Sequence, residues 1–228
     1  RSLAKSGAEL STAMERLSSG KKINSAADDA AGFAIAERMT AQVRGLNMAT
    51  KNANDGLSML ATIENATNDV TDMLHRMREL AVQAANDTNS STDRGYLQTE
   101  VTALIAEIDR VSSDTKYNGT AVLDGTFTSK KLQVGTEAAQ SITFSVSDVD
   151  ATALAVNAAD ISTQAGAATA LTSISAAIET VAGQRATYGA LQNRLEYTVS
   201  NLMNVSEFTQ AARSRIEDAD FAAESARL

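Results

Sequence analysis

The clearest candidate for a ligand site is the run Gly20, Lys21 and Lys22, because a glycine followed by a lysine occurs in phosphate-binding loops. Such a loop has the pattern G-x-x-x-x-G-K-[ST], whose backbone N–H groups wrap the phosphates while lysine and a hydroxyl complete the site. Here Lys22 stands where Ser or Thr is needed, and Glu15 stands where the first glycine is needed. The preceding segment, GAELSTAMERL, has a helical pattern. The sequence therefore disfavours nucleotide binding.

The same stretch is better explained as a joint between two helices. Gly20 follows two serines, and glycine suits the left-handed conformation that ends many helices. The segment from Ser25 to Asp28 resembles a capping signal, and acidic residues are favourable near the positive end of the next helix dipole. We therefore predict a helix joint formed by Gly20, Asn24, Ser25, Asp28 and Asp29.

Other candidate chemistry is weaker. His75 is the only histidine and lies next to Arg76, a poor setting for a metal ligand or a general base. Asp148 and Asp150 lack the Gly and Glu spacing of a calcium loop. No H-E-x-x-H, G-x-S-x-G or dinucleotide glycine pattern is present. We expect no catalytic, cofactor-binding or metal-binding residues, and no enzyme.

Composition narrows the class of protein further. The net charge of −8, from 20 Lys and Arg against 28 Asp and Glu, disfavours nucleic acid and anionic membranes as partners. Cysteine is absent, which excludes disulfides and thiolate metal sites. Proline is also absent and aromatic residues make up 4 % of the chain, a composition typical of long, slender helices. No apolar run approaches the ~18–20 residues of a membrane span, so membrane insertion is not expected.

The spacing of apolar residues predicts long helices. Between about residues 30 and 83 they recur every three or four positions, which is typical of one helix with an apolar stripe, roughly 80 Å long at 1.5 Å per residue. A second stripe runs from Leu97 to Val111, and a third helix from about 167 to 215 includes Val205 on its stripe. Thr67 is the polar member of the first stripe. The residues expected to pack the bundle are Leu57, Leu60, Leu74, Leu104, Ile108, Leu191, Leu195 and Leu202.

Turn signals separate these helices. The segment 85–93 is rich in turn-formers, with Ser90 or Ser91 as a cap, and Asn118-Gly119 is a strong turn signal. KLQV (131–134) and SITFSV (141–146) alternate as paired strands do. The predicted fold is mainly α: an elongated rod of long antiparallel, coiled-coil-like helices with a small β-hairpin region. The expected divisions are a terminal helix and joint (1–29), the first half of the rod (30–125), a hairpin and loop insert (126–166), the last rod helix (167–215) and the start of a terminal helix (216–228).

Several long blocks resemble bacterial flagellin. ERLSSGKKINSAADDAAGFAIAERM, NANDGLSMLATIENATNDV, MRELAVQAANDT and EIDRVSSDTKYNGTAVLDG are similar to its amino-terminal region, and QRATYGALQNRLEYTVSNLMNVSEFTQAARSRIEDADFA to its carboxy-terminal region. The resemblance covers about 1–125 and 180–228. It implies a secreted subunit of the extracellular flagellar filament, exported unfolded by a type III system and assembling helically for motility. The implied partners are other copies of the chain, an export chaperone and a cap protein.

Two features depart from the family pattern. The amino-terminal part is short and the chain stops at Leu228, before the usual final helix would finish, so the resemblance implies a fragment that folds but polymerises poorly. The segment 126–166 is short where family members often carry large outer domains, which implies a smooth, thin filament.

The resemblance also implies recognition by a host leucine-rich-repeat Toll-like receptor, through the helix surface around RELAVQ and the following helix. This face would be buried in the filament, so the monomer would be the recognised form. The alternative for this helix surface is a solvated face with Leu80 in the core. The implied contacts are Arg76, Arg78, Glu79, Leu80, Gln83 and Glu100.

A second function from another class stays open: a flagellin-like surface adhesin or ligand-binding receptor. An acidic chain would attract an acidic polymer only through a local basic patch. The residues available for such a patch are Lys130, Lys131 and Arg94.

Overall fold

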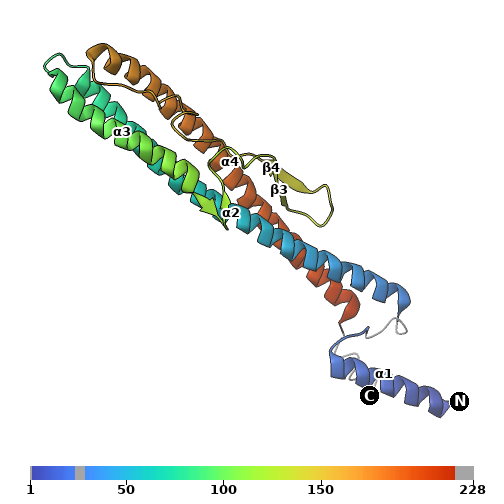
Figure 1. The fold of residues 1–228 in the computed structure, drawn as a ribbon. Coiled ribbons are helices and arrows are strands. Elements are labelled where there is room, and N and C mark those ends of the chain that lie inside the picture. The colour runs from blue at the N-terminus through green and yellow to red at the C-terminus, as the bar shows by residue number, and fades with distance from the viewer. Residues whose placement is uncertain (1, 24–28, 219–228) are drawn as a thin grey trace. The chain divides into compact units, whose positions relative to one another are not determined.

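The computed structural model describes residues 2–23 and 29–218, and within them the fold is mainly α, as predicted (Figure 1). The helices are α1 (Ser2–Ser19), α2 (Ala30–Ala84), α3 (Ser91–Asp114) and α4 (Gln164–Glu217). The strands are β1 (Lys116–Tyr117), β2 (Thr120–Ala121), β3 (Lys130–Gln133) and β4 (Ser141–Phe144). The chain forms two compact units: the first unit is Arg1–Ala53, Gln133–Ser141 and Thr198–Leu228, and the second unit is Asn54–Leu132 and Ile142–Tyr197.

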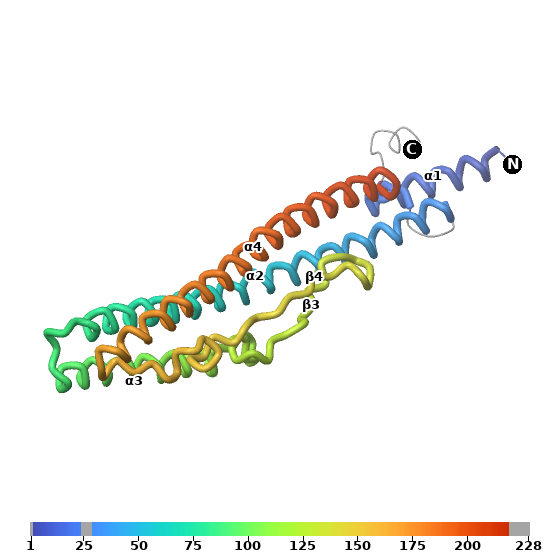
Figure 2. Tube along the Cα trace, turned by 90° about the horizontal axis from the view of Figure 1, so that it is seen from above, coloured from blue at the N-terminus to red at the C-terminus, as the bar shows by residue number. Residues whose placement is uncertain are grey.

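The second unit is a bundle built on the predicted apolar stripes. In it α2 runs antiparallel to both α3 and α4 (Figures 1 and 2). Burial of apolar area at about 25 cal/mol per Å² is the main force that holds such a bundle together. Of the predicted packing residues in this unit, Leu60, Leu74, Ile108 and Leu195 are fully buried, whereas Leu57, Leu104 and Leu191 are half-buried at the edge of the stripe.

Thr67 shows how the stripe accommodates a polar residue. Its side chain is fully buried, and its hydroxyl donates to the carbonyl oxygens of Ile63 at 2.9 Å and Glu64 at 3.1 Å. The hydrogen-bonding capacity of the hydroxyl is therefore met by its own helix, and the remaining methyl group packs as an apolar group.

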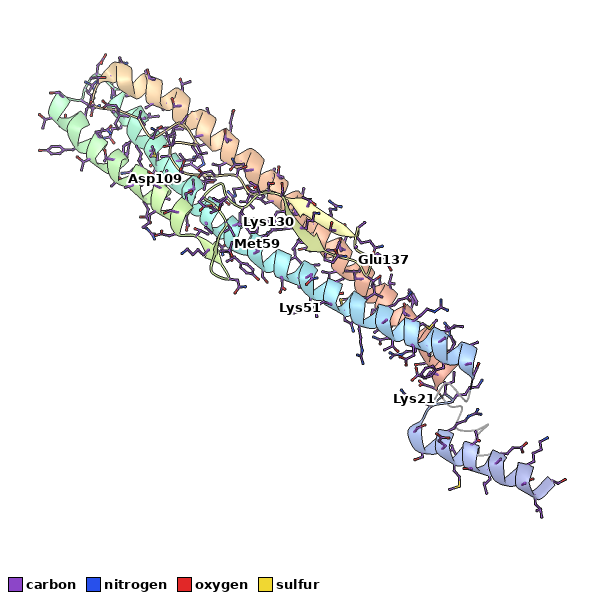
Figure 3. The ribbon with its side chains drawn as sticks, turned by 45° about the vertical axis from the view of Figure 1, so that its right-hand side comes forward. Lys21, Lys51, Met59, Asp109, Lys130 and Glu137 are labelled. Carbon is purple, nitrogen blue, oxygen red and sulfur yellow. The ribbon has the colours of Figure 1, made fainter. Side chains whose placement is uncertain are left out.

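Polar side chains of α3 form hydrogen bonds with the segment that connects β2 to α4, residues 122–163. The Ser112 hydroxyl donates to Leu123 O at 2.8 Å and lies 3.0 Å from Asp148 Oδ1. Asp109, labelled in Figure 3, accepts from the backbone N–H of Ala151 at 2.8 Å. These bonds satisfy backbone and side-chain groups where the segment has no regular ladder.

Two small hairpins confirm the predicted turns. β1 pairs with β2 in an antiparallel ladder, and Asn118 and Gly119 between them have φ values of 51° and 76°. Positive φ at both central positions is what a two-residue type I′ hairpin requires. β3 pairs with β4, as expected, although both strands are displaced or shorter than the sequence indicated. Ser129, immediately before β3, has a positive φ of 51°.

The first unit contains the amino-terminal part of α2 and the carboxy-terminal part of α4. Leu46, Ala49 and Leu202 form a buried cluster between these two helices. Ser206 follows Leu202 by one turn and its hydroxyl lies 3.0 Å from Asn47 Oδ1. Val205 is 40 % exposed, so its place on the predicted stripe was wrong. The contact with α2 uses the turn defined by Leu202 and Ser206, and Val205 lies about 100° away from Ser206 around the helix.

The first unit also contains α1 and the described part of the joint. Gly20 has φ of 73° and its N–H donates to Arg16 O at 2.9 Å, which confirms the left-handed end of α1. Asp29 caps α2, because its carboxylate accepts from Gly32 N at 3.0 Å. The predicted joint residues Asn24, Ser25 and Asp28 lie outside the described residues.

By length and composition, α4 could cross a membrane. An 18-residue window of this helix has a mean hydropathy of 1.2, which counting apolar runs in the sequence did not anticipate. However, Ile174, Ala177 and Val181 lie buried within the second unit, as in a helix of a packed bundle. One such helix is weak evidence for a membrane span.

Candidate functional site

Arg76, Glu79 and Glu100 form a charged cluster on the surface of the second unit, here called the Arg76 cluster. Arg76 Nε donates to Glu100 Oε1 at 2.8 Å, and Nη2 donates to Glu100 Oε2 at 3.1 Å. Its Nη1 donates to Glu79 Oε2 at 3.1 Å. The hydrogen bond from Arg76 lowers the pKa of Glu100, and the same bond raises the pKa of Arg76. A fork-shaped ion pair therefore joins α2 to α3 at an exposed position.

The other residues of the expected receptor surface are not all on this face. Gln83 is exposed and follows Arg76 by two helical turns, so it shares the face of the cluster. Arg78 instead donates to Ser175 Oγ of α4 at 3.2 Å. Leu80 is 1 % exposed and packs inside the bundle, so its assignment as a surface contact needs correction. Because α2 packs against both α3 and α4, it buries a wider face than a single apolar stripe. Leu80 lies within this wider face.

The Arg94 side chain binds backbone carbonyl oxygens at the end of α2 and does not contribute to a surface patch. Its Nε donates to Ala84 O at 2.7 Å and its Nη2 donates to Asn86 O at 3.1 Å, and the side chain is 13 % exposed. Carbonyl oxygens at a helix end have no partner within the helix, and a planar cation can satisfy several of them. Arg94 is therefore not available for the local basic patch that was considered together with Lys130 and Lys131.

Ser90 and Asp93 form a capping box at the start of α3. The Ser90 hydroxyl accepts from Asp93 N at 3.1 Å, and the Asp93 carboxylate accepts from Ser90 N at 2.9 Å. Those hydrogen bonds, the backbone N–H of Ser90 first, lower the pKa of Asp93. The sequence left Ser90 and Ser91 open as caps, and the structure selects Ser90.

We expect Ser90→Ala to lower the free energy of unfolding by about 1 kcal/mol, since it removes a cap acceptor. Ser91→Ala is the matched control and should leave stability nearly unchanged. Because the pKa of Asp93 is lower in the folded state, its contribution is present above the unfolded pKa, near 4, and is lost as pH falls through the folded value. Urea unfolding followed by circular dichroism between about pH 7 and 2 measures both effects. Equal losses for the two serine variants would contradict the cap assignment.

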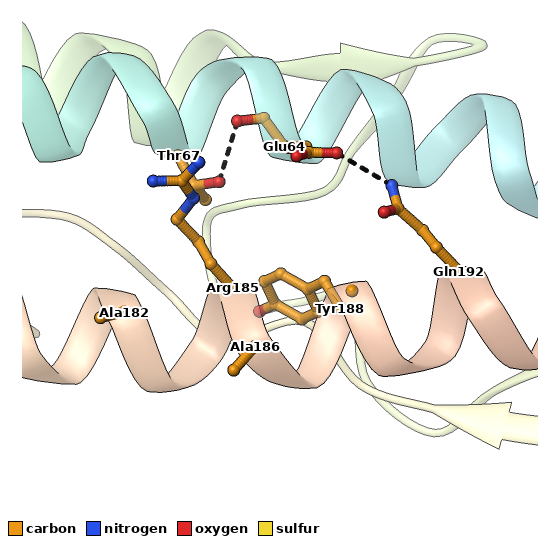
Figure 4. Close-up of a pocket in the computed structure, with 8 residues that line it drawn as sticks. Glu64, Thr67, Ala182, Arg185, Ala186, Tyr188 and Gln192 are labelled. Carbon is orange, nitrogen blue, oxygen red and sulfur yellow. Dashed lines mark hydrogen bonds between the residues drawn. The ribbon is translucent and has the colours of Figure 1, made fainter.

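A cavity of about 300 Å³ lies between α2 and α4 in the second unit (Figure 4). Glu64 Oε2 accepts from Gln192 Nε2 at 3.1 Å across it. Tyr188 is buried on the α4 side and its hydroxyl oxygen accepts from Ser147 N at 3.0 Å, while burial raises the pKa of this tyrosine. The sequence did not indicate this cavity. Its lining residues are Glu64, Thr67, Ala182, Arg185, Ala186, Tyr188, Gly189 and Gln192.

No cluster of metal-ligand side chains is found in residues 2–23 and 29–218: no three His, Cys, Asp or Glu come together there. Asp148 and Asp150, considered as calcium ligands in the sequence, bond to the chain around them: Asp148 Oδ1 accepts from Asp150 N at 2.9 Å, and Asp150 Oδ1 accepts from Ala153 N at 2.7 Å.

Comparison with known proteins gives consistent matches along the chain. The family model of the bacterial flagellin N-terminal helical region matches residues 1–128, and that of the C-terminal helical region matches residues 171–228. A flagellin of Halalkalibacterium halodurans is 45 % identical over 214 residues, covering 93 % of this chain and 79 % of that protein. A flagellin of Bacillus subtilis is 41 % identical over 245 residues, covering 92 % of this chain and 81 % of that protein. The crystal structure of Bacillus cereus flagellin aligns with a TM-score of 0.61 at 32 % identity, over 67 % of this chain and 88 % of that one.

Proposed function

Since the chain belongs to the bacterial flagellin family, we propose that it is exported by the flagellar type III system and assembles helically into the extracellular filament used for motility. Flagellins are structural filament proteins and not enzymes. Export would involve a chaperone that keeps the chain from assembling early, and growth would involve a cap protein at the filament tip.

The observation that carries the self-assembly proposal is a set of large side chains that the folded chain leaves exposed. Tyr96 on α3 is 73 % exposed, and Tyr197 and Phe208 on α4 are 79 % and 74 % exposed. Aromatic side chains are enriched at protein interfaces, where their large area is removed from water. α1 adds Leu3 and Met14, also exposed. A subunit that covers these side chains with neighbouring copies gains free energy on assembly.

Seeded growth tests this function. Sheared flagellar filaments of the source organism are mixed with this chain and, separately, with this chain joined to complete flagellin terminal segments at both ends. We expect the extended chain to elongate the seeds, as seen by electron microscopy. If the extended chain stays monomeric beside competent seeds, the filament proposal fails and the surface adhesin or ligand-binding receptor replaces it.

We further propose that the monomer is recognised by a host leucine-rich-repeat Toll-like receptor through the Arg76 cluster and Gln83. The support is geometric: an exposed, pre-paired set of charges from two helices can meet a partner without reordering long side chains. Arg78 lies toward α4 and Leu80 is buried, so we place both beneath or beside this surface rather than in it.

We expect Arg76→Ala and Glu100→Ala each to lower receptor activation by the monomer at least about tenfold, in line with loss of an interface anchor of about 1.4 kcal/mol or more. The measurement is a dose–response curve in reporter cells that carry the receptor. Arg110→Ala is the matched control, because Arg110 forms a similar exposed ion pair with Glu107 on α3. Unchanged activation by both cluster variants, or an equal loss with the control, would exclude the Arg76 cluster as the contact.

A further inference from the structure

Arg185 is the one polar side chain in the lining of the α2–α4 cavity whose buried donor has no partner within the described part of the chain. Its Nε atom is buried and makes no hydrogen bond. A buried, unpaired donor on a cation is costly, because it has lost water and gained nothing in return. Such a group needs a hydrogen-bond acceptor in some state of the protein.

Three other polar side chains of the cavity each make at least one hydrogen bond within the described residues. The carboxylate of Glu64 accepts from Gln192, and the hydroxyl of Thr67 bonds to the backbone of α2 (Figure 4). The hydroxyl of Tyr188 accepts from Ser147 N. None of these groups makes a hydrogen bond with Arg185 Nε within the described residues. An acceptor from another molecule can therefore satisfy this donor.

The α4 side of the cavity leaves room for an incoming side chain. Ala182, Ala186 and Gly189 form part of the lining, and a Cβ atom added at Gly189 would meet no heavy atom within 4 Å. Short side chains allow another backbone to approach the helix closely. The cavity volume of about 300 Å³ also exceeds what one acidic side chain occupies.

We propose that Arg185 receives a carboxylate side chain from a second copy of this chain when subunits assemble. The proposal rests on the filament function above. A guanidinium can pair with a carboxylate through two parallel charge-assisted hydrogen bonds, which are stronger than hydrogen bonds between neutral groups. The chain carries 28 acidic residues against 20 basic ones, so a neighbouring copy presents an excess of carboxylates to this cation. A cavity on one surface that accepts a group from a different surface makes a head-to-tail contact, which can repeat into a helical assembly.

Seed elongation by Arg185→Gln, in the chain carrying complete terminal segments, tests this contact. We expect its critical concentration to rise about tenfold or more relative to the wild type, as loss of a charge-assisted hydrogen bond implies. Arg185→Lys keeps the positive charge but lacks the planar guanidinium, so its critical concentration should lie between those of the wild type and Arg185→Gln. Arg110→Gln removes an exposed arginine of α3 and should elongate like the wild type. The melting temperature of each monomer is measured in parallel.

Single-cysteine labelling gives a second, independent measurement, because the natural chain contains no cysteine. Gly189→Cys should react with a maleimide in the monomer and be protected at least about tenfold in the filament. Elongation of Arg185→Gln at the wild-type rate, or full labelling of Gly189→Cys in the filament, overturns the proposal while leaving the filament function intact. A lower melting temperature of the Arg185→Gln monomer also overturns it, since Arg185 would then serve the fold. If the extended chain with Arg185 unchanged does not elongate the seeds, both the filament function and the Arg185 contact are overturned.

Discussion

Leu60→Ala is expected to lower the free energy of unfolding by about 3 kcal/mol, because it removes a fully buried side chain from α2 and leaves a cavity. Leu60 lies in the second unit, where α2 packs against α3 and α4, so the surrounding side chains are held from two sides. A site that cannot collapse keeps most of the cavity, which places the cost well above the loss of transfer free energy alone. Urea or guanidinium unfolding followed by circular dichroism at 222 nm provides the measurement.

Leu57→Ala and Met203→Ala are the matched controls for Leu60→Ala. Leu57 is on the same helix but half-buried, and we expect a loss of about 1 kcal/mol from the smaller area removed from water. Met203 is 58 % exposed on α4, and its truncation should change stability by less than about 0.5 kcal/mol. A Leu60→Ala loss no larger than that of Leu57→Ala would contradict the packing described for the second unit.

Arg94→Met is expected to lower the free energy of unfolding by about 2 kcal/mol. Methionine retains much of the apolar stem of arginine but cannot donate to the carbonyl oxygens of Ala84 and Asn86. Those oxygens would lose a charge-assisted donor at the end of α2, where no helical N–H can replace it. In the turn at residues 85–90 the side chain of Asn89 would remain as a donor, since its Nδ2 donates to Gln83 O at 2.6 Å and to Asn86 O at 2.8 Å.

Two further variants separate the geometry of Arg94 from its charge. Arg94→Lys keeps a cation near the helix end but not the planar fork, so we expect about half of the loss. Arg110→Met removes an exposed arginine and should cost less than about 0.5 kcal/mol. Hydrogen exchange of the amides in the turn offers a local readout, with faster exchange expected in Arg94→Met. Stability equal to the wild type would mean that water replaces the guanidinium at little cost.

The helices and turns could be predicted from the sequence because their causes are local. Apolar residues every three or four positions marked Leu60, Leu74 and Ile108 as buried, and the structure buries all three. Asn118-Gly119 indicated a tight turn because few other residue pairs tolerate positive φ at both positions, and both values are positive. The flagellin resemblance rested on the same long blocks that the two family models match.

The candidate site was predictable only in part. The residues Arg76, Glu79 and Glu100 were singled out through the family resemblance, but their pairing joins positions that lie on different helices. Sequence spacing relates Arg76 to Glu79 on one helix face, whereas the contact with Glu100 depends on the register between α2 and α3. The cavity around Arg185 depends on the same kind of packing between α2 and α4, and no local signal marks it.

Local patterns in the sequence were therefore enough to predict the class of fold, the helical stripes, the tight turns and the family. The packed structure was needed to show that Leu80 is buried, that Val205 is exposed, that Arg94 binds the end of α2, and that Nε of Arg185 has no hydrogen-bond partner within the described residues. The physical reason is that periodicity gives the angle of a side chain around its own helix axis. The neighbours that a side chain contacts depend on how the helices pack against one another. The burial and the contacts of these four residues therefore depend on that packing.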